Sequence, residues 1–121
     1  MTTMQKQETT ETRPERMARR TALVPPVDVL ENREEFLIRA DFPGVRQEDV
    51  DVQFEKNTLA LVGRFSARGD DALDHEWTRT FVMPGGVDAA KIAAELKDGV
   101  LTVHLPKQES LKPRQIPVRT A

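Results

Sequence analysis

The chain has 121 residues, of which 38% are hydrophobic, which is enough for one hydrophobic core but not for two. The formal net charge of −2 gives no electrostatic footprint for nucleic acid, and the absence of cysteine excludes disulfides, thiolate metal sites and a cysteine nucleophile. Apolar runs are too short to cross a membrane and no secretory signal is seen, so we expect a cytoplasmic protein without nucleic-acid or membrane partners.

The first segment, residues 1–24, is rich in Thr, Glu and Arg and contains no aromatic residue. Its few apolar groups cannot offset the entropy lost on ordering the backbone, so we expect a flexible N-terminal arm. Four arginines make the arm locally basic, and we interpret them as solvated charges: Arg13, Arg16, Arg19 and Arg20. Pro25-Pro26 then predicts the entry to ordered structure.

Three runs with period-two hydrophobicity follow, which predicts strands with one buried face. Their apolar positions are Val27 and Val29, then Phe36, Ile38 and Ala40, then Val50, Val52 and Phe54. Glu31-Asn32 and Pro43-Gly44 are predicted as turns between them. Lys56-Asn57 predicts a hairpin after which Leu59 and Leu61 return antiparallel, and Gly63 is expected to end that strand.

Residues 66–76 have the composition of a loop, and two further strands are predicted after it. The first is "WTRTFVMP". The second is "GVLTVHLP", with Leu101, Val103 and Leu105 on one face. Short strands at this spacing, separated by turn signals, predict an antiparallel β-sandwich.

The segment 88–99, "DAAKIAAELKDG", is ambiguous. Asp88 could cap a helix, and Ile92 and Leu96 have the i,i+4 spacing of a helical face. Ile92, Ala94 and Leu96 also alternate as a strand requires. Local propensity alone favours a helix.

No arrangement of residues predicts catalysis or a cofactor. His75 and His104 are the only histidines, and no metal-ligand spacing, nucleophile elbow or phosphate loop surrounds them. Asp70, Asp71 and Asp74 could in principle cluster, but they lack the spacing of a calcium loop and are better explained as a solvated loop. Trp77 is predicted to anchor the core or a sheet face. We expect no enzyme activity and no cofactor.

Three stretches resemble one family. "AELKDGVLTVHLPK" resembles the signature of the alpha-crystallin domain of small heat-shock proteins, whose A-x-x-x-n-G-v-L pattern matches Ala94, Asp98, Gly99, Val100 and Leu101. "FLIRADFPGVRQEDVDVQFEKNTLALVGR" is similar to the family's strand–Pro-Gly–strand–hairpin segment. Ile116 and Val118 match its Ile-x-Ile/Val tail motif. The resemblance implies an all-β, immunoglobulin-like sandwich in which residues 92–96 form a strand, so it overrules the helix.

The resemblance also implies three regions: a flexible arm over 1–24, an alpha-crystallin domain over 25–107, and a C-terminal extension over 108–121 that carries Ile116, Pro117 and Val118. The family's activity is that of an ATP-independent holdase, which binds non-native client proteins. The tail motif would dock in a groove between strands 50–55 and 92–97. Its walls would be Val50, Val52 and Phe54 on one side and Ile92, Ala94 and Leu96 on the other. Lys107 to Gln115 is long enough to reach the chain's own groove or a neighbour's.

Two features depart from the family pattern. Residues 64–77 are too short for the extra strand that many bacterial and plant members exchange within a dimer, so a different dimer edge, or none, must be considered. The arm lacks the aromatic residues that many members use for assembly, so we expect dimers or modest homo-oligomers. The alternative function is that of a CS-domain-like adaptor, a related sandwich that binds one folded partner.

Overall fold

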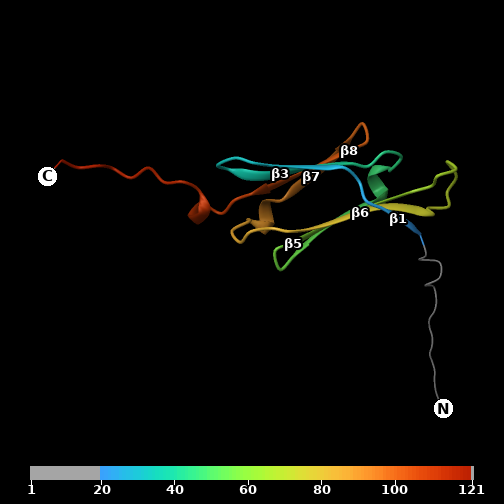
Figure 1. The fold of residues 1–121 in the computed structure, drawn as a ribbon, viewed down its shortest axis with the longest axis horizontal. Coiled ribbons are helices and arrows are strands. Elements are labelled where there is room, and N and C mark those ends of the chain that lie inside the picture. Colours follow the sequence, from blue (N-terminus) through green and yellow to red (C-terminus); the bar gives the residue numbers. More distant parts are fainter. Residues whose placement is uncertain (1–19, 121) are drawn as a thin grey trace, which may run out of the picture.

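Two four-stranded β-sheets lie face to face in the computed structural model, which describes residues 20–120 (Figure 1). One sheet has the order β1-β6-β5-β4 and the other the order β2-β3-β8-β7. The strands are β1 (Thr21–Leu23), β2 (Val27–Glu31), β3 (Glu35–Asp41), β4 (Val50–Glu55), β5 (Thr58–Phe65), β6 (His75–Val82), β7 (Ala93–Lys97) and β8 (Val100–Pro106). Three short 3₁₀ helices join them: η3 (Gln47–Asp49), η4 (Ala89–Lys91) and η5 (Glu109–Leu111). The predicted immunoglobulin-like β-sandwich is confirmed.

The core lies between the sheets and consists of the inward positions of the alternating runs. Its buried residues are Phe36, Ile38, Ala40, Phe42, Val45, Leu59, Leu61, Met83, Val87, Leu101, Val103 and Leu105. Each large apolar side chain buried here contributes about 1.5–3 kcal/mol before ordering costs. Trp77 packs partly buried against this core, stacks on Phe65 at 5.6 Å between ring centroids, and donates from Nε1 to the Pro43 carbonyl.

Ordered structure begins earlier than the Pro25-Pro26 pair predicts. Thr21–Leu23 pairs in parallel with β6, the one parallel pair among the described strands. The Thr21 amide donates to the Asp74 carbonyl, and Arg20 Nε donates to the Leu73 carbonyl at 2.6 Å. This strand exists because the β6 edge accepts it, which local composition does not reveal. The rest of the predicted arm, residues 1–19, lies outside the described residues.

The prediction that Gly63 ends its strand is wrong. Gly63 lies inside β5, between Val50 of β4 and Trp77 of β6. A β-carbon at this position would lie 2.5 Å from Cδ2 of Phe42, whose side chain is fully buried. The glycine is therefore required by the close approach of an aromatic ring, and the strand continues past it.

Two of the three predicted turns are confirmed by their backbone angles, whereas in the third, Glu31-Asn32, Glu31 lies inside β2 and the bend follows at residues 33–34. Lys56 and Asn57 both have positive φ, 51° and 62°, and connect Glu55 directly to Thr58, as a two-residue hairpin turn demands. In the second turn, Gly44 has a φ of 83°, and the Val45 amide donates to the Phe42 carbonyl. Only glycine adopts that angle without strain.

The ambiguous segment divides into a helical turn and a strand. Helical backbone is confined to η4, and β7 then pairs with β8 from Ala93 opposite His104 to Lys97 opposite Val100. Pairing with a neighbouring strand outweighs the helix propensity of the two alanines at its start. The loop over residues 66–74 contains no strand, and within residues 20–120 no helix is long and apolar enough to cross a membrane.

Candidate docking groove

A shallow groove runs between the two sheets along one side of the sandwich, where β4 is the edge of one sheet and β7 the edge of the other. It has a volume of about 230 Å³. The residues that line it are Gln47, Val50, Val52, Ala94, Glu95, Leu96 and Leu101. Apolar side chains form its floor and walls, and Gln47 and Glu95 supply its polar groups.

Strand register explains which side chains reach the groove. Val50 and Val52 lie opposite Gly63 and Leu61, which are buried positions of β5, so both valines point inward. Ala94 and Leu96 likewise lie opposite Val103 and Leu101, buried positions of β8. The inward side chains at both sheet edges are incompletely covered, and this leaves an apolar strip open to solvent.

The structure brings four of the six predicted wall residues to this groove, namely Val50, Val52, Ala94 and Leu96. Phe54 lies further along β4 and Ile92 lies just before β7, and both pack against the core without lining the groove. The sequence interpretation missed Gln47, Glu95 and the role of Leu101. Gln47 lies in a 3₁₀ turn that strand periodicity does not predict, and Glu95 points away from the core by alternation but borders the rim.

The family-signature residues build the end of the groove. Asp98 and Gly99 both have positive φ, 51° and 77°, and connect Lys97 directly to Val100 in a tight hairpin turn. The Gly99 carbonyl accepts a hydrogen bond of 2.7 Å from the Phe42 amide, which fixes the turn against the end of β3. The turn returns the chain so that buried Leu101 forms part of the groove floor beside Leu96.

The tail motif is not docked in the chain's own groove. Ile116 is 76% exposed and Val118 is 93% exposed. The C-terminal segment extends away from the sandwich, as Figure 1 shows. The pair therefore does not cover its own domain in this structure.

The base of the tail, by contrast, is fixed to the sandwich. Leu111 packs on Gly86, where a β-carbon would lie 2.5 Å from Leu111 Cδ2, and the Gln108 amide donates to the Gly86 carbonyl. Lys112 pairs with Glu109 at 2.8 Å and with Glu34 at 3.1 Å. The hydrogen bond to Glu109 raises the pKa of Lys112 and lowers the pKa of Glu109. The free segment of the tail thus begins after Lys112.

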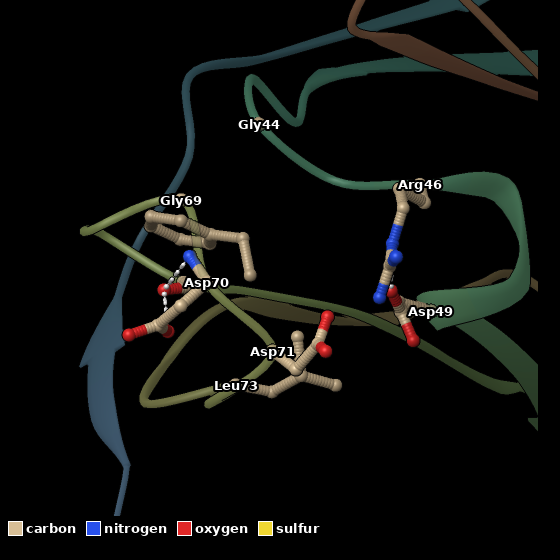
Figure 2. Close-up of a pocket in the computed structure, with 9 residues that line it drawn as sticks. Gly44, Arg46, Asp49, Gly69, Asp70, Asp71 and Leu73 are labelled. Atoms are coloured by element: carbon tan, nitrogen blue, oxygen red, sulfur yellow. Dashed lines mark hydrogen bonds and ion pairs between the residues drawn. The ribbon is translucent and has the colours of Figure 1, made fainter.

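A second hollow, of about 150 Å³, lies beside the loop over residues 66–74 (Figure 2). On one side Arg46 and Asp49 point toward each other, with Nε and Oδ2 3.0 Å apart. The loop carries the acidic residues considered above. Asp70 accepts hydrogen bonds from Ser66 Oγ and the Ala72 amide, which lower its pKa.

Asp74, at the end of the same loop, pairs with His75 at 2.9 Å and accepts from the Ala67 amide, and both interactions lower its pKa. Two of the three loop carboxylates are therefore engaged in holding the loop in shape. Among the described residues no group of three or more His, Cys, Asp or Glu side chains is arranged to hold a metal ion.

These features define a class of protein: an immunoglobulin-like β-sandwich with an apolar groove between two edge strands and an exposed Ile-Pro-Val tail. The chain belongs to the Hsp20/alpha crystallin family, whose model matches residues 28–119. A probable 15 kDa heat shock protein of Leptospira interrogans is 36% identical over 105 residues, which are 81% of this chain and 80% of that protein.

Two solved structures have the same fold. Heat shock protein 16.0 from Schizosaccharomyces pombe superposes with a TM-score of 0.62 at 30% identity, covering 80% of this chain and 99% of that one. A small heat-shock protein from Xylella fastidiosa has a TM-score of 0.62 at 31% identity, covering 81% and 98%. The match to Spore protein SP21 of Stigmatella aurantiaca, at 30% identity, spans 64% of that protein's length.

Proposed function

We propose that this chain is an ATP-independent holdase, which binds non-native client proteins and prevents their aggregation. Its subunits would assemble when the tail motif of one copy docks in the groove between β4 and β7 of another. The observation that carries the proposal is the pairing of an open apolar groove with an exposed apolar motif on the same chain. Membership of the family supports the holdase activity.

Such a protein acts by burying apolar surface. Exposed apolar surface attracts the apolar segments of unfolding proteins and keeps them from one another. Burying Ile116 and Val118 would contribute roughly 1.5–3 kcal/mol each before ordering costs. After those costs a single tail would bind at about the millimolar level, near −4 kcal/mol. Pro117 restricts φ and so lowers the entropy lost on docking.

Docking between copies is supported by the fixed base of the tail. Lys112 is held at Glu34, next to the end of the sheet where Glu35 lies opposite Pro106. Three residues separate Lys112 from Ile116, and the four steps between the two Cα atoms span at most about 14 Å when fully extended.

The far end of the chain's own groove is further away than that. Leu101, on the groove floor, is five residues along β8 from Pro106, about 17 Å, and β7 lies two strand spacings, about 10 Å, to the side of β3. While the base stays fixed, a tail that fills the whole groove is therefore better supplied by another copy. The proposed assembly is therefore held by contacts that are individually weak, collectively sufficient and readily exchanged.

A heat-aggregation assay without ATP tests the holdase activity. A thermally labile enzyme is heated with this protein, and turbidity is followed at increasing molar ratio. Suppression at a near-stoichiometric ratio is expected. No suppression, together with tight binding to one native protein, would instead establish the adaptor function.

A further inference from the structure

The strand β2 is an uncovered edge of the sandwich. Among the described strands it pairs with β3 alone, and its other side faces solvent. Val29 is 55% exposed and Leu30 is 48% exposed. Natural edge strands are often protected by lysine, proline or a bulge, and β2 has none of these within its five residues, where Asp28 and Glu31 are the only charges. The loop over residues 66–74, which has no strand of its own, supplies no cover for it.

Two hydrogen bonds establish which backbone groups of β2 are free. Asn32 donates to the Glu35 carbonyl, and Asp41 donates to the Pro26 carbonyl. In an antiparallel pair the bonded residues alternate, so the even-numbered residues of β2 direct their N–H and C=O groups toward β3. The odd-numbered residues Val27, Val29 and Glu31 direct theirs outward.

We propose that this edge pairs with the same edge of a second copy, antiparallel, with the twofold axis at Val29. In this register Val29 lies opposite Val29 of the second copy, and Val27 lies opposite Glu31. All three residues with free backbone groups then meet residues with free groups. Sliding the strands by two residues in either direction leaves one such residue on each strand unmatched.

The charges of β2 also suit this register. Asp28 lies directly opposite Leu30 of the second copy, and the two Asp28 side chains are only diagonal to each other, so no two like charges are directly opposed across the seam. Within its own chain Asp28 lies opposite Arg39 of β3. Glu31 is held by Lys107, whose Nζ donates to Glu31 Oε2 at 2.7 Å and whose side chain is packed over the Phe36 ring. Both acidic residues have a cation beside them when the edge is covered.

A second copy fits this edge better than the tail does, because Pro117 has no N–H at the centre of the tail motif. The seam is short, however, and smaller than a stable stand-alone interface. We therefore expect a dimer that dissociates on dilution. This seam does not depend on the holdase proposal, since it uses neither the groove nor the tail.

The seam is tested in full-length chain that carries Ile116→Ala and Val118→Ala, because these substitutions remove the tail contacts. The quantity measured is the mass. Sedimentation over a hundredfold concentration range should give a monomer–dimer equilibrium. Adding Val29→Lys to this variant should leave only monomer, because the twofold axis places the lysine directly opposite the same lysine of the second copy. The matched control is Val82→Lys, at a valine that is 83% exposed on β6, and it should leave the dimer unchanged. Circular dichroism checks that each variant folds.

Dimer that survives Val29→Lys overturns the seam. If the dimer survives and that variant protects a client less well, the edge binds client segments in place of a second copy. The seam is also overturned if the variant with Ile116→Ala and Val118→Ala is monomeric at every concentration.

Cross-linking tests the register, because the chain has no cysteine of its own. Val29→Cys places two thiols on directly opposed residues, about 5.5 Å apart between Cα atoms, which a disulfide can bridge. Leu30→Cys places them diagonally, about 7–8 Å apart, and should link poorly. Equal or reversed yields would overturn the proposed register.

Discussion

Leu111 lies in the space that a side chain on Gly86 would occupy, and this contact fixes where the C-terminal tail leaves the sandwich. A β-carbon on Gly86 would be 2.5 Å from Leu111 Cδ2, and Gly86 has a φ of 100°. The contact therefore depends on glycine for both space and backbone angle. The tail motif begins only five residues after Leu111, so its reach is determined by this anchor.

Releasing the anchor should change the proposed assembly. Leu111→Ala combined with Lys112→Ala removes the packing on Gly86 and the ion pairs to Glu34 and Glu109. The tail is then free from Glu109 onward and can reach its own groove, so we expect smaller species in native mass spectrometry. Arg68→Ala, which removes an exposed cation in the loop over residues 66–74, is the control. An unchanged mass distribution would contradict docking between copies.

Removing the motif should also shrink the assembly. Ile116→Ala with Val118→Ala deletes most of the apolar area that the tail offers, and light scattering should report a lower mass. Gln115→Ala with Thr120→Ala is the matched control, because it alters the same tail without touching either apolar side chain. A mass equal to that of the unaltered chain would rule out the docking role.

The groove itself can be tested from the opposite side. Ala94 is exposed and lines the groove, whereas its neighbour Ala93 is exposed on the outer face of the sheet. Ala94→Asp introduces a charge that a docked isoleucine or valine would have to desolvate, so we expect a loss of assembly of tenfold or more. Ala93→Asp should have little effect, since it adds the same charge outside the groove. Equal masses for the two variants would show that the groove is not the docking site.

Gly63→Ala should destabilise the fold. The added methyl group would collide with the Phe42 ring, and overpacking of this kind costs about 1–3 kcal/mol. For a domain of this size each kcal/mol lowers Tm by about 4–8 °C, which calorimetry measures. Gly85→Ala is the control, because a β-carbon there meets no atom within 4 Å. The same Tm for both variants would contradict the packing argument.

The loop over residues 66–74 should respond to acid. Folding lowers the pKa of Asp70 and of Asp74 below the ordinary value of 3.8, so each carboxylate stabilises the loop above that pH. The stabilisation should be lost as the pH falls through the lowered values. NMR titration should give carboxyl midpoints below 3.8, with the Ala72 and Ala67 amides shifting at the same midpoints. Midpoints at or above 3.8 would show that these hydrogen bonds are absent in solution.

The turns and the alternating strands could be predicted from sequence because both are local. Lys56-Asn57 and Pro43-Gly44 are recognisable from the backbone angles that their residues tolerate. The register of Val50 and Val52 follows from period-two alternation. Four of the seven residues that line the groove were predicted on this basis together with the family resemblance.

The errors all concern contacts between segments that are distant in sequence. Position 63 lies inside a strand and is glycine because the Phe42 ring leaves no room for a β-carbon. Thr21–Leu23 is a strand because β6 offers an edge. The anchor at Leu111 depends on Gly86, which is 25 positions earlier in the sequence. The local propensities of these residues do not predict which distant segments they contact.

The exposed motif and the open groove have a consequence for stoichiometry. Each chain carries one of each, so in any collection of copies the number of vacant grooves equals the number of undocked tails. Under the proposed mechanism, a client segment that occupies a groove displaces one tail, and that tail then competes for the next groove. Client loading would therefore spread from subunit to subunit by exchange, without a signal passing through the fold.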